Sequence, residues 1–321
     1  MLGPGTNILP SFIEGFAQEF SHLTDNLSNV VGVLRVNTAM WRNLLFLMSM
    51  IFPGLGLAHD YGARIDGATW HLEPSPLKCR LWQAVPNYGD AVFELEAGQD
   101  LKFYIDSYRP VDKPGQAKVS IVAPNWRPDI SPKSIGETRL QTGRRPIELA
   151  HEVANQLLAE LMGGMYPSFS HPGWYDPHPV QVNVSAVNFQ DAYSGYMSCV
   201  AGLYPAGYSD LKLSLLHFET NKYGIKGKLK QRLDLIAGYI ALDPSVKKIY
   251  VDGHTDSDGR RGHNWELSRL RAQEVKDYLE SQGIFPEMVE MRYHGEGRPA
   301  RRNSNKANKA VNRRVSVRLT R

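Results

Sequence analysis

The chain has 321 residues, of which 42% are hydrophobic, 22% charged and 10% aromatic. This composition is that of a folded globular protein and excludes a largely disordered chain, while the length allows one large domain or two of ordinary size. The formal net charge of +4 is too small to indicate, by itself, a protein that binds nucleic acid.

The first distinctive segment is the apolar run LLFLMSMIFPGLGLA at positions 44–58. It is shorter than the roughly 20 residues that cross a bilayer, and Pro53 interrupts it. A basic residue precedes it and small residues end it, which is typical of a secretory signal peptide. We therefore expect a signal peptide over residues 40–58, translation from position 40, and residues 1–39 as a misassigned upstream extension. A type II membrane anchor with residues 1–39 in the cytoplasm is the alternative.

Two cysteines, Cys79 and Cys199, are present and do not form a CxxC pair, which argues against a cysteine zinc site. Signal cleavage would deliver the protein to an oxidising compartment, where a disulfide between them is expected. That bridge would close a loop of about 120 residues. Two buried free thiols are the alternative.

Residues 59–207 are expected to form a β-rich domain. Alternation of apolar and polar residues and a high content of β-branched and aromatic residues predict strands at 80–85, 91–96, 101–106, 118–122 and 179–184. One helix is predicted over 147–162, directly after Pro146, because leucine or valine recurs there every four residues. No catalytic motif occurs in this half of the chain.

From residue 208 onward, strands and helices alternate. Strands are expected at 211–218, 247–251, 288–293 and 314–319, and amphipathic helices at 227–242 and 264–282. The order βαβαββ predicts a sheet packed against helices, as in a sandwich. The whole chain is therefore expected to be an α+β protein, with a β-rich domain at 59–207 and a compact α/β unit at 208–321.

Arg271 is unusual within the helix expected at 264–282. On a helical wheel it lies on the apolar side, between Leu267 and Val275, although a guanidinium keeps its proton at physiological pH. Asp256 lies in the Gly- and Asp-rich turn before this helix, so an anion and a cation are expected close together. Such a pair complements the free end of an amino acid, with arginine binding the carboxylate and aspartate the ammonium. A salt bridge between Arg271 and Asp256 is the alternative.

An ordered set of residues carries a family resemblance. The set is Gly253-His-Thr-Asp256, Asn264, Leu267-Ser-Arg-Leu-Arg271-Ala272, Gly295-Glu-Gly297, Pro299, Asn303 and Asn312-Arg-Arg-Val315. It resembles the pattern of the OmpA-like peptidoglycan-binding domain. The resemblance implies binding of diaminopimelate in the peptidoglycan stem peptide, with Asp256 taking the ammonium and Arg271 the carboxylate. It also implies that Asn264, Arg313 and Thr255 line the same pocket.

The rest of the chain is similar to the MotY family of flagellar motor proteins. The supporting stretches are Tyr88-Gly-Asp-Ala-Val-Phe93, Asn125-Trp-Arg-Pro128, Tyr166-Pro-Ser-Phe169 and Val187-Asn-Phe-Gln190. The lipobox cysteine of peptidoglycan-associated lipoproteins is missing after the signal, and the 44–58 run lacks the acidic residue of a stator protein. The resemblance implies a periplasmic basal-body component on the outer-membrane side, whose residues 59–207 dock onto the motor.

The partners implied by this resemblance are peptidoglycan, ring proteins such as MotX and, indirectly, the stator complex. We expect no enzymatic activity, no nucleic-acid partner and no membrane span after signal cleavage. We also expect neither a metal nor a cofactor, because no HExxH motif or complete calcium loop is present. The alternative function is a general envelope protein that links peptidoglycan to the outer membrane without any role in the motor.

Overall fold

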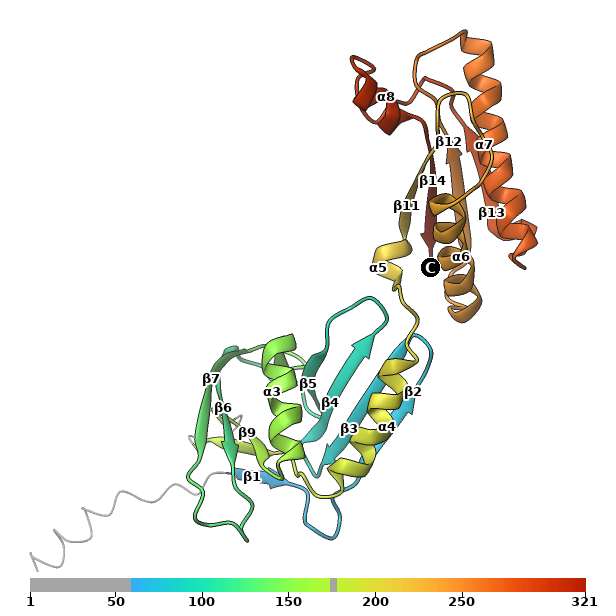
Figure 1. Cartoon of the computed structure of the whole chain (residues 1–321). Coiled ribbons are helices and arrows are strands. Elements are labelled where there is room, and N and C mark those ends of the chain that lie inside the picture. The colour runs from blue at the N-terminus through green and yellow to red at the C-terminus, as the bar shows by residue number, and fades with distance from the viewer. Residues whose placement is uncertain (1–58, 174–177) are drawn as a thin grey trace, which may run out of the picture. The chain divides into compact units, whose positions relative to one another are not determined.

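The structure is a computed structural model that describes residues 59–173 and 178–321 (Figure 1). The expected signal peptide at 40–58 and the expected extension at 1–39 lie outside the described residues. Within the described ranges, no helix combines the length and the apolar character needed to cross a membrane.

The first half of the described chain is rich in strands, as expected. Its strands are β1 (His59–Gly62), β2 (Trp70–Pro74), β3 (Lys78–Val85), β4 (Gly89–Glu96), β5 (Lys102–Ser107), β6 (Gly115–Val122), β7 (Lys133–Leu140), β8 (Ile147–Leu149), β9 (Tyr166–His171) and β10 (Val180–Asn183). One sheet has the order β1-β10-β9-β6-β7 and the other the order β2-β3-β4-β5-β8. The pair β1–β10 is parallel, and the remaining pairs are antiparallel. Inward-facing apolar residues of both sheets share one core.

The helix predicted over 147–162 is wrong at its start. Ile147–Leu149 forms β8, which pairs with β5, and helix α3 (His151–Met162) begins only after it. Ile147 and Leu149 are buried while Glu148 is exposed, so these three residues follow the period of a strand. Pairing with a neighbouring strand therefore overrides the helical spacing of the leucines.

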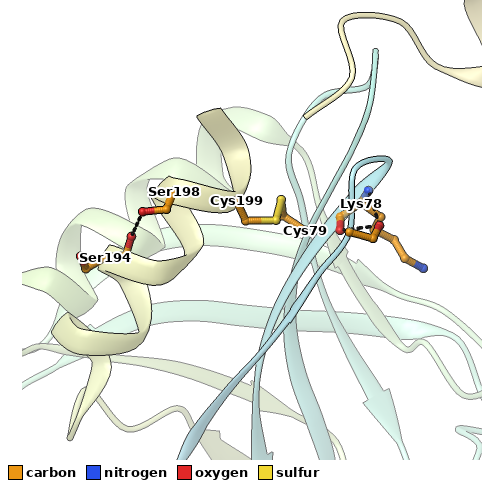
Figure 2. Close-up of a disulfide and its surroundings, with 6 residues drawn as sticks. Lys78, Cys79, Ser194, Ser198 and Cys199 are labelled. Atoms are coloured by element: carbon orange, nitrogen blue, oxygen red, sulfur yellow. Dashed lines mark hydrogen bonds between the residues drawn. A yellow bond between two sulfur atoms is a disulfide. The ribbon is translucent and has the colours of Figure 1, made fainter. Parts of the chain in front are cut away.

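A disulfide joins β3 to helix α4 (Phe189–Ala201), which confirms the expected bridge between Cys79 and Cys199. Figure 2 shows Cys199 on the helix facing Cys79 on the strand. The two Cα atoms are 5.9 Å apart. Only Phe189 and Tyr196 of α4 are buried, and the helix packs on β2 and β3. The bridge thus fixes a helix that buries few of its side chains.

The second half of the described chain contains a four-stranded sheet with the order β11-β14-β12-β13. Its elements are α5 (Tyr208–Leu211), β11 (Leu213–His217), α6 (Lys228–Leu242), β12 (Lys248–Gly253), α7 (Arg261–Ser281), the 3₁₀ helix η1 (Pro286–Met288), β13 (Val289–Tyr293), α8 (Lys306–Asn312) and β14 (Arg314–Thr320). The expected order βαβαββ is confirmed, with α8 inserted before the last strand. The pair β12–β13 is parallel, and β14 is antiparallel to both of its neighbours.

Helices α6 and α7 pack on this sheet and enclose its core. At Gly253, the last residue of β12, a Cβ atom would lie 2.1 Å from the carbonyl oxygen of Ser268 on α7. Only glycine allows this approach, because any side chain would collide with the helix backbone. Since β11 and β12 run in the same direction, the loops that follow them and the start of β14 meet at one end of the sheet, where these strands finish.

Candidate functional site

The loop that follows β12 carries Thr255 and Asp256 at this end of the sheet. Backbone hydrogen bonds fix it to two other segments: the His254 N–H donates to the Arg314 carbonyl over 2.9 Å, and the Thr255 N–H donates to the Gly295 carbonyl over 2.9 Å. The loop is therefore held in place before its side chains are considered.

Asp256 forms an ion pair with Arg313. The Arg313 Nη1 group donates to Asp256 Oδ2 over 2.9 Å, and the exposed fractions of the two side chains are 14% and 6%. The other carboxylate oxygen accepts a hydrogen bond from the Asp258 N–H at 3.2 Å. Arg313 is also held by its Nε, which donates to the Phe218 carbonyl over 3.2 Å. Asp256, which was expected to lie close to Arg271 or to form a salt bridge with it, thus pairs with Arg313 in the structure.

Arg271 is fully buried on α7, as its position on the apolar side predicts. Its guanidinium donates to three backbone carbonyls: Nε to Lys222 over 2.8 Å, Nη1 to His254 over 3.0 Å and Nη2 to Glu219 over 3.0 Å. These bonds use three of its five N–H groups. Arg271 therefore ties the loop after β11 to the loop after β12.

The electrostatics around Arg271 also reflect Asp256 and Arg313. Burial lowers the pKa of Arg271 to about 10; the negative charge of Asp256 opposes this shift, and the positive charge of Arg313 adds to it. A pKa of about 10 still leaves the guanidinium protonated at neutral pH. The site therefore holds one carboxylate and two cations within electrostatic reach of one another.

The remaining predicted residues, Thr255 and Asn264, are also buried at this end of the sheet. Asn264 lies in the first turn of α7, and its amide donates to Glu296 Oε2 over 2.6 Å. The hydroxyl of Thr255 has no hydrogen-bond partner in the part of the chain that the structure describes. A buried hydroxyl without a partner costs free energy, so a polar group bound beside Thr255 would be stabilising.

A second polar cluster lies on the neighbouring strands. The rings of His254 and His294 lie 4.9 Å apart between centroids, and Asp252 accepts hydrogen bonds from His294 at 3.0 Å and Arg292 at 2.9 Å. Burial, together with the positive charge of Arg314, lowers the pKa of His254 to about 4. His254 is therefore neutral at neutral pH and places no additional positive charge beside the Asp256 loop.

Several hydrogen-bond partners in this site were not predicted from the sequence. Glu296, which holds Asn264, lies inside the Gly295-Glu-Gly297 motif, so the motif offered a signal for it. The carbonyls of Glu219 and Lys222 offered none, because a backbone carbonyl looks the same at every position. The motif residues Asn303 and Asn312 bind each other over 2.8 Å, and Asn312 also exchanges hydrogen bonds with the backbone of Arg301.

Comparison with known proteins matches both halves of the chain. The MotY N-terminal domain family matches residues 61–205, and the OmpA family matches residues 217–313. The sodium-type flagellar protein MotY of Vibrio parahaemolyticus is 30% identical over 266 residues, which cover 81% of this chain and 90% of that protein. The peptidoglycan-associated lipoprotein of Pasteurella multocida is 35% identical over 119 residues, or 36% of this chain and 79% of the lipoprotein.

Among solved structures, the C-terminal domain of MotB from Helicobacter pylori is similar, with 25% sequence identity and a TM-score of 0.31. That similarity covers 34% of this chain and 84% of the MotB fragment.

Proposed function

This chain belongs to the MotY family of flagellar motor proteins, and from that premise we propose that it anchors stator units to the cell wall by binding peptidoglycan. The protein is then a periplasmic, non-enzymatic component of the basal body. The stators need a fixed support against the reaction to the torque that they generate, and the cell wall is rigid enough to provide it. The OmpA-family domain, found at residues 217–313, is the part that would bind the peptidoglycan of the wall.

The ion pair between Asp256 and Arg313, close to the charge of Arg271, is the observation that carries this proposal. The free end of diaminopimelate bears one ammonium and one carboxylate. Its ammonium would bind Asp256, and its carboxylate would bind Arg271 with Arg313 beside it; because Arg271 is fully buried, this binding requires the loops around its guanidinium to move apart. One internal ion pair is exchanged for two with the ligand, so that no charge is left buried and unpaired.

Thr255 and Asn264 have supporting roles in this proposal. The unpaired hydroxyl of Thr255 would donate to or accept from the bound amino acid. Asn264 would act through Glu296, by holding the 294–297 loop against the start of α7. Both side chains are buried, and most buried polar groups are hydrogen-bonded, so the unpaired hydroxyl of Thr255 is the one that a ligand would satisfy.

The two halves of the chain have different binding roles in this proposal. We assign residues 59–207 to docking on ring or basal-body proteins such as MotX, and residues 208–321 to the wall. Contact with the stator complex would be indirect, through the ring. The family matches at 61–205 and 217–313 support this division.

Co-sedimentation with purified sacculi tests the wall-binding site. Asp256→Asn keeps the shape of the side chain and removes its charge, so binding is expected to weaken by about thirtyfold or more. Asp258→Asn is the matched control in the same loop, since that side chain is 55% exposed and pairs with Lys309; its binding is expected to equal that of the unmodified protein. Full binding by a correctly folded Asp256→Asn variant would refute the site.

A further inference from the structure

Strand β11 is the outermost strand of its sheet, and one of its edges has no strand beside it among the described residues. Two backbone bonds fix which residues face β14: the Leu319 N–H donates to the Lys212 carbonyl, and the Phe218 N–H donates to the Arg313 carbonyl. In an antiparallel pair, successive residues direct their N–H and C=O groups alternately to the two edges. The N–H and C=O groups of Leu213, Leu215 and His217 therefore point to the free edge.

The side chains along this edge are apolar where charge would be expected. Leu213 is 56% exposed and Leu215 is 49% exposed. Free edges in natural proteins are usually blocked by charged side chains, proline, bulges or a covering segment, because an open apolar edge pairs readily with another strand. The free edge of β11 thus has the two properties that an added strand needs, unpaired backbone groups and exposed apolar side chains.

A groove with a volume of about 880 Å³ lies beside the edge, between β11, the 218–227 loop and the start of α6. Leu215 and Tyr223 contribute apolar surface to it. Its charged lining consists of Lys222, Lys226, Lys228, Arg232 and Glu219. The four cations against one carboxylate give the groove a strong positive charge, and the three lysines are exposed.

We propose that β11 is the docking strand for an extended segment of a partner protein in which acidic and apolar residues alternate. The segment would add to the free edge through main-chain hydrogen bonds, as in β-strand addition. Side chains of a strand alternate between its two faces, so its apolar residues would cover Leu213 and Leu215 while its acidic residues face the lysines. A second copy of this chain is disfavoured as the occupant, since it would bring two lysine-rich grooves together.

A synthetic nine-residue peptide of alternating glutamate and valine is a direct probe of this surface. Fluorescence anisotropy with the purified protein is expected to show binding of this peptide and none of a matched lysine–valine peptide. Hydrogen exchange is expected to show slower exchange of the Leu213, Leu215 and His217 amides in the complex. Binding without protection of these amides would overturn the proposal.

Three variants separate edge pairing from general charge attraction. Reversal of Lys226 and Lys228 to glutamate is expected to weaken binding by about fivefold or more. Leu215→Pro removes one outward N–H without removing a bond to β14, and is expected to abolish binding. Lys306→Glu reverses an exposed lysine on α8 outside the groove and is expected to leave binding unchanged. Equal weakening by Lys306→Glu, or dimerisation through β11 without peptide, would refute a heterologous acidic partner.

Discussion

Reduction of the disulfide between Cys79 and Cys199 is expected to destabilise the N-terminal domain strongly. The bridge spans 120 residues, and on the chain-entropy model a loop of that length contributes about 5 kcal/mol at 25 °C. A domain of about 145 residues has an unfolding entropy near its Tm of about 0.3 kcal/mol/K, so the loss corresponds to a fall in Tm of roughly 16 °C. The loss should begin at α4, because few of its side chains are buried.

Calorimetry of the protein with and without a reducing agent measures this shift. The OmpA-family domain contains no cysteine, so its own transition serves as an internal reference and is expected not to move. Reduction is a cleaner perturbation than Cys79→Ala, because Cys79 is fully buried and the substitution would add a cavity. A fall in Tm of less than about 3 °C on reduction would refute the loop-closure reasoning.

Three further predictions concern the C-terminal half and the motor. In the folded protein the pKa of His254 is about 4, below the value of about 6.5 in an unfolded chain. The free energy of unfolding is therefore highest above about pH 6.5 and falls by up to about 3 kcal/mol as the pH drops toward 4. Urea unfolding of a His254→Gln variant is expected to lack this slope; an unchanged slope would contradict it. Arg271→Lys is expected to lower the free energy of unfolding by about 2–4 kcal/mol, because an ammonium cannot reach all three carbonyls. Hydrogen exchange of the 218–227 loop should then be faster, and unchanged exchange would contradict the role of Arg271 in holding the two loops together. A deletion strain is expected to swim poorly with an intact envelope, whereas normal swimming with a weakened envelope would favour the general envelope function.

The α/β half was predictable because its local patterns agree with its tertiary structure. The apolar stripes of α6 and α7 face the core that they fill, and the isolated arginine on α7 is buried. The disulfide was predictable from two cysteines and the oxidising compartment that the expected signal peptide implies. In the first half, α4 and the strands β1, β2, β7, β8 and β9 were not predicted. Helix α4 is mostly polar and aromatic, so the bridge and its packing on β2 and β3 define it more than its sequence period.

The residues of the candidate site could be selected from the sequence, and their role in binding stays a prediction; their pairing in the structure could not be foreseen. Asp256, Arg271, Asn264 and Thr255 could be selected because the motif and the helical wheel single them out. The ion partner of Asp256 depends on where β14 begins, since Arg313 immediately precedes that strand and is 57 residues away in the chain. Two of the three carbonyl partners of Arg271 are about 50 residues away, and only the folded chain brings them within reach.

Calorimetric titration with two stem peptides tests the zwitterion site most directly. One peptide carries diaminopimelate as its third residue, and the other carries lysine, which keeps the ammonium and lacks the second carboxylate. If the site binds both charges, the diaminopimelate peptide should bind at least about tenfold more tightly, and Asp256→Asn should remove that binding. Equal affinity for the two peptides, or an affinity that Asp256→Asn leaves unchanged, would contradict recognition of the wall through this site.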